Sequence, residues 1–509
     1  MHSPAPSSAA GPDDALDVLI VGAGLSGIGA AATLRQRCPG KRFAILEARD
    51  AIGGTWDLFR YPGIRSDSDM YTLGYAFRPW RDPKAIADGP AIRAYVAETA
   101  REHGIDAHIR FGHQLTKASW CGAAALWTVE ARLAGGEVRT LRTRFLYLCC
   151  GYYSYDQAYR PCFEGEEAFA GRIVQPQFWP EDLDYGGKRV VVVGSGATAV
   201  TVVPAMTDRA AHVIMLQRSP TYVVARPSRY RFAQRMRALF PERLAYALTR
   251  WRVIGESMFL YWLARSKPEL VKRKIVAMAG RQLGSREAAA AHFTPGYKPW
   301  DQRVCVVPDG DLFKALRAGK ASVVTDHIAR FTRHGILLRS GRELEADVVV
   351  MATGLTLQLF GGASLVVDGR SVDPSRAMSY KGMMLSDVPH CALAFGYTNA
   401  SWTLKADLTA EWVCRLLRHM DAHGQRLAVA PRDPAVPEAP FLDFNSGYVE
   451  RARHLLPKQG ARKPWHVYQN YLRDLLTIRF GRIDDGVLRL LPRGAAQTHA
   501  QSAAHGDRP

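Results

Sequence analysis

The sequence predicts an α/β fold with two Rossmann-like domains and a helical insertion. Apolar runs of strand length begin at Asp17 and at Arg189, and each is followed by a glycine turn and a helical segment. A further apolar run follows each helix and completes a βαβ unit. From Arg226 to about Gln282 the sequence is rich in basic and aromatic residues and has helical composition, which predicts the insertion. We therefore expect two doubly wound parallel sheets.

The first unit carries the spacing Gly22-x-Gly24-x-x-Gly27 between its strand and its helix. Gly22 permits the tight turn, Gly24 lets the backbone approach a pyrophosphate, and Gly27 lets helix and strand pack closely. The helix N-terminus supplies a positive pole for the phosphates. Glu47 lies 20 residues beyond Gly27, at the end of the second strand, where a carboxylate accepts hydrogen bonds from ribose hydroxyls.

A second glycine turn follows this unit and helps to indicate which dinucleotide the unit binds. Gly53 opens the turn, and the candidate cofactor-binding residues in it are Gly54, Thr55 and Trp56. This turn, together with the position of the unit near the N-terminus, favours FAD over NAD.

The second unit carries Gly194-x-Gly196-x-x-Ala199. Its second strand ends in Gln217-Arg218-Ser219 and not in an acid. An arginine at this place suits a 2′-phosphate, so the unit favours NADPH over NADH. An ordinary surface position for Arg218 remains open. The pair of units indicates one chain that binds FAD and NADPH.

The order of these units predicts how the domains divide the chain. The expected segments are a disordered tail (1–14), the first part of the FAD-binding domain (15–150), a linker (151–185), the first part of the NADP-binding domain (186–225), the helical insertion (226–300), the second part of the NADP-binding domain (301–355), the second part of the FAD-binding domain (356–492) and a second disordered tail (493–509).

Composition narrows the class of protein. The 509 residues are 47% hydrophobic and 23% charged, which excludes a wholly disordered chain. No apolar run is long enough for a membrane span, and the N-terminus lacks the features of a signal peptide. The net charge of +19 attracts anions such as phosphorylated cofactors, acidic lipid or nucleic acid, and does not choose among them. Two dinucleotide sites account for part of it, and no nucleic-acid partner is expected.

The eight cysteines exclude several other functions. None forms a C-x-x-C pair, so a disulfide reductase, which needs two cysteines beside the flavin, is disfavoured, and no metal site is expected. Reduced thiols predict a cytoplasmic location. The basic helical insertion leaves open a peripheral contact with the inner face of the cell membrane, although packing against the protein itself, with arginines that snorkel, is the preferred interpretation. An oligomer also remains open.

Longer segments carry a resemblance to a known family. They are GGTWDLFRYPGIRSDSDMYTLGY (53–75), FAGRIVQPQFWPEDLDY (169–185), SPTYVV (219–224), KPWDQRVCVVPDGDLF (298–313), YKGMMLSDVP (380–389), GYTNASWTLKADL (396–408), PKQG (457–460) and QNYLRD (469–474). They resemble the class B flavoprotein monooxygenases of the Baeyer–Villiger type, and more narrowly an ethionamide-activating mycobacterial subfamily. The resemblance extends from about Asp17 to Pro492.

The resemblance implies roles for two catalytic residues. Arg303 matches the arginine that lies over the flavin and stabilises an anionic peroxide there. Asp67 matches the acid that pairs with this arginine and positions it. A fixed cation in a dry site suits such chemistry, because preorganised charge stabilises most where water is excluded. An ordinary surface pair between Arg303 and Asp301 is the alternative.

Two positions depart from the family pattern. The fingerprint F-x-G-x-x-x-H-x-x-x-W is represented by Phe169, Gly171, Gln175 and Trp179, with glutamine in the place of histidine. Glutamine donates and accepts hydrogen bonds but does not titrate, so oxygenation is expected to persist, with impaired coupling if the charge matters. Gln302 stands where many Baeyer–Villiger enzymes have a lysine that binds the 2′-phosphate, so Arg218 would contribute more to that recognition.

The resemblance implies an FAD- and NADPH-dependent monooxygenase. With O₂ it would convert ketones to esters or lactones, or oxidise the sulfur of sulfides and thioamides, through a C4a-peroxyflavin. An N-hydroxylating flavin monooxygenase and an NADPH oxidase uncoupled by Gln175 remain open. A non-catalytic flavin-binding partner protein is the least favoured class.

Overall fold

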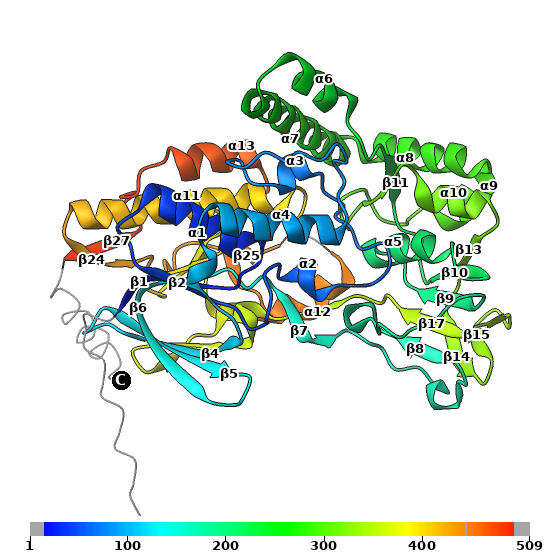
Figure 1. Ribbon diagram of the computed structural model, residues 1–509, viewed down its shortest axis with the longest axis horizontal. Helices are drawn as coiled ribbons and strands as arrows, with labels where there is room; N and C mark the ends of the chain where they lie inside the picture. The colour runs from blue at the N-terminus through cyan, green and yellow to red at the C-terminus, as the bar shows by residue number, and fades with distance from the viewer. Residues whose placement is uncertain (1–14, 443–444, 493–509) are drawn as a thin grey trace, which may run out of the picture.

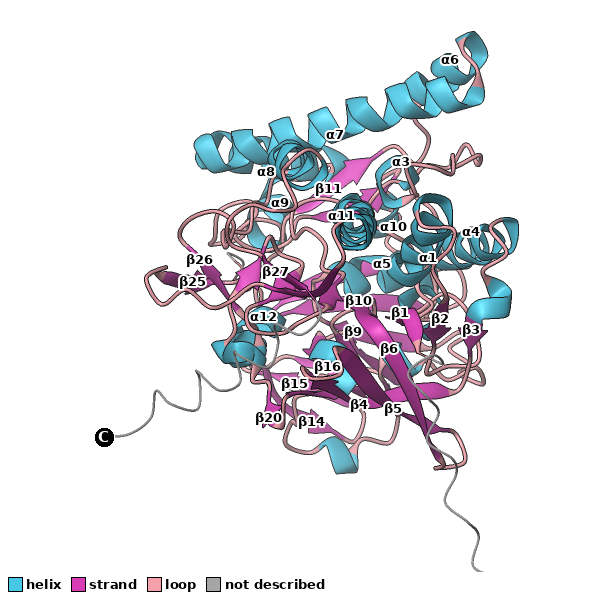
Figure 2. Ribbon diagram, turned by 90° about the vertical axis from the view of Figure 1, so that its left-hand side faces the viewer, coloured by secondary structure: helices cyan, strands magenta, loops and turns pink. Residues whose placement is uncertain are grey.

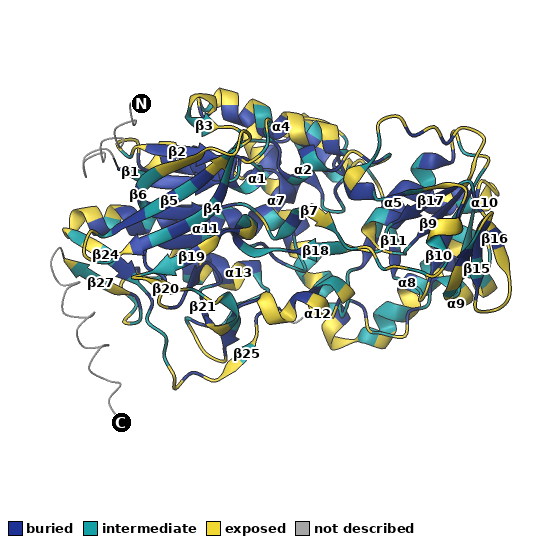
Figure 3. Cartoon of the chain, turned by 90° about the horizontal axis from the view of Figure 1, so that it is seen from below, coloured by how far each residue is buried: buried dark blue, intermediate teal, exposed yellow. Residues whose placement is uncertain are grey.

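The computed structural model describes residues 15–442 and 445–492. Both predicted tails, 1–14 and 493–509, lie outside these residues. Two separate sheets form the centres of two lobes, and most of the buried residues gather around them (Figure 1, Figure 3). The division of the chain into domains stays a prediction.

The first sheet contains the N-terminal βαβ unit. In spatial order its strands are β20 (Arg370–Ser371), β19 (Ser364–Val367), β4 (His113–Cys121), β5 (Leu126–Leu133), β6 (Val138–Leu148), β1 (Leu16–Val21), β2 (Phe43–Leu46) and β3 (Ile109–Arg110), and β23 (Cys391–Leu393) also pairs with β6. β6 pairs parallel with β1 and antiparallel with β5. The sheet is therefore mixed.

Side chains of β1 alternate between two cores. Val18 and Ile20 pack against a layer of helices, α1 (Leu25–Arg37), α4 (Gly89–Glu102) and α11 (Trp402–Ala422). Leu19 and Val21 face the opposite way and pack against β4 and β5. Helices thus cover one face of the sheet and antiparallel strands cover the other. The expectation of a doubly wound parallel sheet is wrong here, because the β4–β6 meander occupies the second face.

The second sheet is wholly parallel, as predicted. Its order is β13 (Ala321–Thr325), β10 (His212–Gln217), β9 (Arg189–Val193), β17 (Val348–Met351) and β8 (Arg172–Val174). α5 (Ala197–Met206) and α10 (Asp311–Arg317) pack on one face. The other face is covered by β14 (Ile328–Thr332), β15 (Gly335–Leu338) and β16 (Glu343–Glu345), so it is not doubly wound either. β8 falls within the segment 151–185, which therefore supplies an edge strand of this sheet.

A run of helices follows β11 (Val223–Arg226) and precedes β12 (Cys305–Pro308), which pair in parallel. The helices are α6 (Arg231–Leu239), α7 (Glu242–Ser266), α8 (Pro268–Leu283) and α9 (Arg286–His292). α6 and α7 lie along one outer edge of the molecule in both Figure 1 and Figure 2. Within the part of the chain that the structure describes, no helix is long and apolar enough to cross a bilayer.

The remaining elements are short. The helices are α2 (Thr55–Leu58), α3 (Met70–Leu73), α12 (Gly447–Ala452) and α13 (Tyr471–Asp474), and the paired strands are β7 (Tyr153–Ala158) with β18 (Leu355–Leu357), β21 (Ser379–Tyr380) with β22 (Met384–Leu385), β24 (Gln425–Val429) with β27 (Arg489–Pro492) and β25 (Glu438–Pro440) with β26 (Lys458–Gly460).

Candidate functional site

The first glycine turn joins β1 to α1, and its backbone atoms approach one another very closely. Gly22 has a φ of +102°, a conformation that favours glycine. A Cβ at Gly27 would lie 1.8 Å from the carbonyl oxygen of Gly22, so only glycine fits at this contact. α1 starts at Leu25, after Gly24, and no side chain caps its N-terminus. Its first N–H groups are therefore available to an anion, as a pyrophosphate site requires.

Glu47 connects this turn to the end of β2. Its Oε2 accepts a hydrogen bond of 2.7 Å from the N–H of Ala23, and its Oε1 accepts one of 3.0 Å from the N–H of Arg49. Burial raises the pKa of the Glu47 carboxyl above its ordinary value. The carboxylate lines a large cavity, where it retains lone pairs for a hydroxyl ligand.

The second glycine turn lies directly against the first. Gly24 and Gly53 form an isolated parallel bridge, and a Cβ at Gly54 would lie 3.1 Å from the Cα of Gly24. Gly53 and Gly54 both have positive φ values, and Thr55 and Trp56 then begin α2. The two turns thus bring bare backbone together on one wall of the cavity, in the place predicted for FAD.

Arg303 pairs with Asp67 across 236 residues of sequence. Nη1 of Arg303 lies 3.0 Å from Oδ2 of Asp67, and both side chains line the cavity. The Asp67 carboxylate raises the pKa of Arg303 above its already high ordinary value, so the guanidinium stays charged. Asp301, the alternative partner, binds Arg265 at 2.7 Å instead. The structure thus makes the Arg303–Asp67 pair predicted from the resemblance.

The segment that carries Asp67 is held on both sides, by an ion pair before it and by a helix cap after it. Just before it, Arg65 pairs with Asp311 at the start of α10. Just after it, Asp69 caps α3 by accepting hydrogen bonds from the N–H groups of Tyr71 and Thr72. These contacts fix the backbone on both sides of Asp67.

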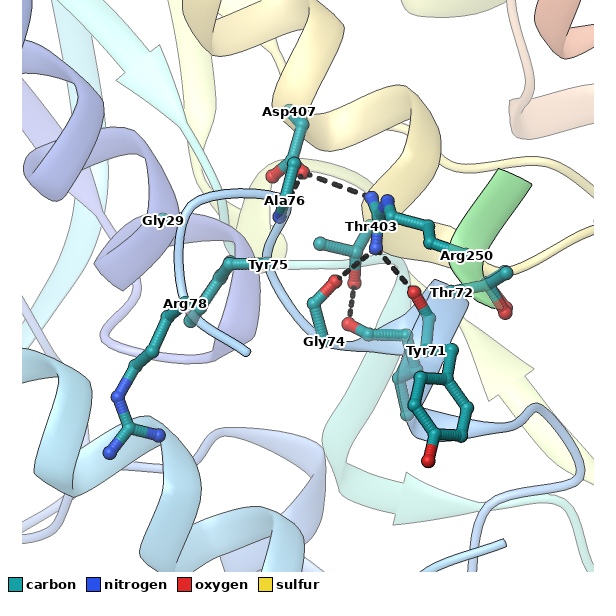
Figure 4. Close-up of polar contacts among 12 residues, drawn as sticks. Gly29, Tyr71, Thr72, Gly74, Tyr75, Ala76, Arg78, Arg250, Thr403 and Asp407 are labelled. Carbon is teal, nitrogen blue, oxygen red and sulfur yellow. Dashed lines mark hydrogen bonds and ion pairs between the residues drawn. The ribbon is translucent and has the colours of Figure 1, made fainter. Parts of the chain in front are cut away.

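Arg250 of α7 completes this support at the other end of α3 (Figure 4). Its Nη1 donates hydrogen bonds of 2.7 Å to the carbonyls of Tyr71 and Gly74, and Nη2 lies 3.4 Å from Oδ2 of Asp407 on α11. Burial raises the pKa of Asp407 to about 6. The sequence did not single out Arg250, because nothing in the basic run distinguishes one buried arginine from its exposed neighbours.

The turn between β9 and α5, in the second βαβ unit, has one crowded and one open glycine. A Cβ at Gly194, whose φ is +137°, would lie 2.3 Å from the carbonyl oxygen of Ala352, whereas a Cβ at Gly196 would meet no atom within 4 Å. α5 follows without a capping side chain, and its first residues line the cavity. Ala199 is buried in the core beneath the helix. This start of a helix therefore also fits a pyrophosphate.

Arg218 lies exposed immediately after β10 and does not line the cavity. The preceding Gln217 is buried, and its Nε2 donates hydrogen bonds to the carbonyl of His292 and to Thr325. The position is that predicted for a group beside a ribose 2′-phosphate. The role stays a prediction.

The fingerprint residues lie beside the second sheet and not on the cavity wall. Gly171 needs to be glycine, because its Cβ would lie 2.5 Å from both the carbonyl oxygen of Asp347 and the ring of Phe169. Trp179 packs against the core under α5. Gln175, the departure from the pattern, has a buried Nε2 that finds no hydrogen-bond partner among the described residues.

The cavity that joins these parts has a volume of about 1370 Å³ and lies where the two lobes meet. Glycine turns, uncapped helix starts and Glu47 line one part of it, and the Arg303–Asp67 pair lines another. It also includes Asn399 and Trp402, from the segment predicted to line the substrate side. The residues fit a flavin dinucleotide and a second nucleotide.

Comparisons with known proteins agree with this geometry. Residues 84–423 match the flavin-binding monooxygenase-like family, and residues 20–99 match an NAD(P)-binding Rossmann-like domain. The chain is 54% identical to the FAD-containing monooxygenase EthA of Mycobacterium tuberculosis over 94% of its own length and 98% of that protein. It is 48% identical to the probable FAD-binding monooxygenase AlmA of Acinetobacter baylyi, over 93% and 95%.

Solved structures show the same fold at low sequence identity. A steroid monooxygenase bound to NADP superposes with a TM-score of 0.75 at 22% identity, over 94% of this chain and all of that chain. A cyclohexanone monooxygenase from Rhodococcus sp. Phi1 gives 0.71 at 20% identity, over 94% and 99%. With more than half of its length matched by the family and a relative of 54% identity, the chain belongs to the flavin-binding monooxygenase-like family.

Proposed function

We propose that this protein is an FAD- and NADPH-dependent monooxygenase that oxidises ketones to esters or lactones and also oxidises the sulfur of sulfides and thioamides. The observation that carries the proposal is the Arg303–Asp67 pair on the wall of the cavity that the first glycine turn and Glu47 also line. A cyclohexanone monooxygenase of the same fold supports ketones as the substrate class.

The first glycine turn, Glu47 and the second glycine turn would hold FAD. The N-terminus of α1 would bind the pyrophosphate and Glu47 the ribose hydroxyls. When bound and reduced, FAD supplies the activation of O₂. The protein contributes geometry and charge around it.

Arg303 would hold a fixed positive charge beside the reacting atoms. Its partner Asp67 fixes the direction of the guanidinium, so no reorientation is needed when negative charge develops in the cavity. Asp67 itself is held by the contacts of Arg65, Asp69 and Arg250 described above. Charge placed in advance stabilises a developing anion more than charge that must first move.

The Gly194–Gly196 turn before α5 and Arg218 would bind NADPH. The start of α5 offers uncapped N–H groups to the pyrophosphate, and Arg218 offers its guanidinium to the 2′-phosphate. Gln302 cannot supply the charge of a lysine, which leaves Arg218 with the larger part of the discrimination against NADH.

One observation supports a second candidate, an uncoupled NADPH oxidase. The buried Nε2 of Gln175 lacks a partner among the described residues, so the fingerprint segment carries an unsatisfied donor where the family pattern has histidine. If the segment fails to close on the nucleotide, NADPH consumption would yield hydrogen peroxide in place of product.

Product yield measured against NADPH consumption separates the candidates. The purified, flavin-loaded protein is assayed with a long-chain ketone, a thioamide and an amine. Ester or S-oxide in near-equal amount to the NADPH consumed supports the proposal. Hydroxylamine supports an N-hydroxylating enzyme. Hydrogen peroxide equal to the NADPH consumed supports the oxidase.

Replacement of Arg303 tests the mechanism within the same assay. Arg303→Ala should keep its flavin spectrum and lose product formation on the order of 10²–10³-fold, as expected for the loss of one preorganised charge. Arg172→Ala is the matched control, since Arg172 pairs with Asp182 on the surface outside the cavity. An Arg303→Ala protein with normal product would remove Arg303 from the mechanism.

The location and assembly of the protein are also proposals. A cytoplasmic protein with peripheral contact to the inner face of the membrane fits the basic helices, and oligomerisation is compatible with the fold. The membrane contact is developed next from the surface of α7.

A further inference from the structure

α7 presents a line of large apolar side chains to the outside. Leu244, Leu248, Trp251, Phe259 and Trp262 recur at three- to four-residue spacings, or multiples of them, and so lie on one side of the helix. Their exposed fractions run from 38% to 57%. We call these five residues the α7 stripe. The preferred interpretation of this region as an ordinary packed insertion does not explain it.

The opposite side of α7 accounts for this orientation. It packs inward through residues that include Tyr246, Thr249, Arg250 and Val253, and Arg250 is held by three oxygen contacts. A helix that placed its apolar stripe inward would expose this network and lose its hydrogen bonds. The stripe is therefore fixed on the outside of the folded protein.

Basic side chains surround the stripe. From Arg231 to Leu283, the segment that forms α6 to α8 contains nine arginines and three lysines against three glutamates, a net charge of +9 within a chain of net charge +19. One of these arginines, Arg250, is buried. Two of the glutamates already bind arginine, Glu242 with Arg81 and Glu256 with Arg226. A large part of the net charge thus lies in about a tenth of the sequence.

Other elements extend the apolar surface beyond α7. At the end of α6, Leu239 is 69% exposed and Phe240 follows it. On the other side, Tyr471 of α13 contacts Trp251 at 6.0 Å between ring centroids. Leu472, Leu476 and Phe480 follow at four-residue spacing, and each is exposed. Exposed apolar side chains therefore lie on α6, on α7 and in the region of α13, which are segments far apart in the sequence.

The large cavity opens at this surface. Phe259 and Trp262 of the stripe also line the cavity, and each is 57% exposed. Arg265, Lys274 and Arg473 are exposed lining residues of the same region. Residues that line a cavity and remain exposed mark its mouth, so this mouth has an apolar and basic rim.

We propose that the α7 stripe, together with α6 and α13, docks on the surface of a membrane that contains anionic lipid. Leucine, tryptophan and phenylalanine on one side, flanked by arginine and lysine, is the pattern of helices that lie in the interface of a bilayer. The arginines would meet lipid phosphates while the stripe enters the acyl boundary. A second copy of this chain would bring the same positive charge against itself, which opposes self-association.

Vesicle co-sedimentation of the flavin-loaded full chain tests the proposal without a need for turnover. The probes are vesicles of phosphatidylcholine alone and of phosphatidylcholine mixed with phosphatidylglycerol. We expect binding to the anionic vesicles, weaker binding to the neutral ones, and weakening by salt. Absence of binding to anionic vesicles would overturn the proposal, whatever the enzyme assay gives.

A pair of double variants locates the surface. Leu244→Ser with Leu248→Ser should reduce partition to anionic vesicles roughly tenfold or more, since two inserted side chains become polar. Phe111→Ser with Val138→Ser is the matched control, because these residues are similarly exposed but lie on the first lobe, away from α7. None of these four residues lines the cavity, so NADPH oxidation should remain unchanged and reports that each variant is folded.

Light scattering of the same proteins addresses a second copy as the occupant. The Leu244 and Leu248 double variant should have the same mass in solution as the unmodified protein. If it dissociates a dimer while its binding to vesicles is unchanged, the surface is an interface between copies and the lipid proposal is wrong.

Discussion

Replacement of Gly27 by alanine should abolish flavin binding through the backbone alone. The added Cβ would lie 1.8 Å from the carbonyl oxygen of Gly22, whereas carbon and oxygen in contact need more than 3 Å. α1 would have to move away from β1 by more than 1 Å, in a region whose residues are buried on both sides. The expected cost exceeds the roughly 1–3 kcal/mol of an ordinary overpacked core site.

The assay is the ratio of flavin to protein absorbance after gel filtration, with the melting temperature measured on the same samples. Gly196→Ala is the matched control, because its Cβ would meet no atom within 4 Å. The control should keep its flavin and its melting temperature and show a raised KM for NADPH only. A Gly27→Ala protein with full flavin content and unchanged melting temperature would refute the steric reasoning.

Three further predictions concern charge and hydrogen bonding. Arg218→Ala should raise the KM for NADPH roughly tenfold or more and leave that for NADH unchanged, which steady-state kinetics with both nucleotides checks. Gln175→His should lower the peroxide formed per NADPH if the orphaned Nε2 causes uncoupling, and an unchanged ratio would remove Gln175 as the cause. Because the folded-state pKa of Asp407 is raised to about 6, its protonated form contributes stability that is complete below about pH 4 and is lost as the pH rises through about 6. Asp407→Asn should therefore remove roughly 3 kcal/mol of the fall in stability between about pH 4 and pH 7, measured by thermal unfolding, and an unaltered pH slope would contradict this assignment.

Local patterns explain most of what the sequence predicted about the fold. Each glycine turn lies between a short apolar strand and a helix, and all three parts are adjacent in the chain, so both βαβ units were identified. The covering of the second face of each sheet was not predicted, because it depends on strands such as β4 and β14 that are remote from the strands they cover. The parallel order of the second sheet was right, and that of the first was wrong.

The residues of the candidate site also fall into those that a local sequence signal identifies and those that depend on contacts between distant segments. Glu47 was identified by its distance from Gly27, which is a local signal. The pairing of Asp67 with Arg303 spans 236 residues and came from resemblance, since nothing in either segment names the other. Arg250 was missed because its role depends on the backbone carbonyls of Tyr71 and Gly74. Every residue has a backbone carbonyl, so the sequence does not show which of them a side chain contacts.

Arg250 has a consequence for the order in which the chain folds. Its hydrogen bonds end a helix of four residues that was synthesised 179 positions earlier, at Tyr71. A helix this short does not persist alone in water, so α3 acquires its final form only after α7 has docked. The loop that holds Asp67 therefore becomes ordered late in folding. A fragment that lacks α7 would retain the glycine turns of both βαβ units, but Asp67 would not be held in position to pair with Arg303.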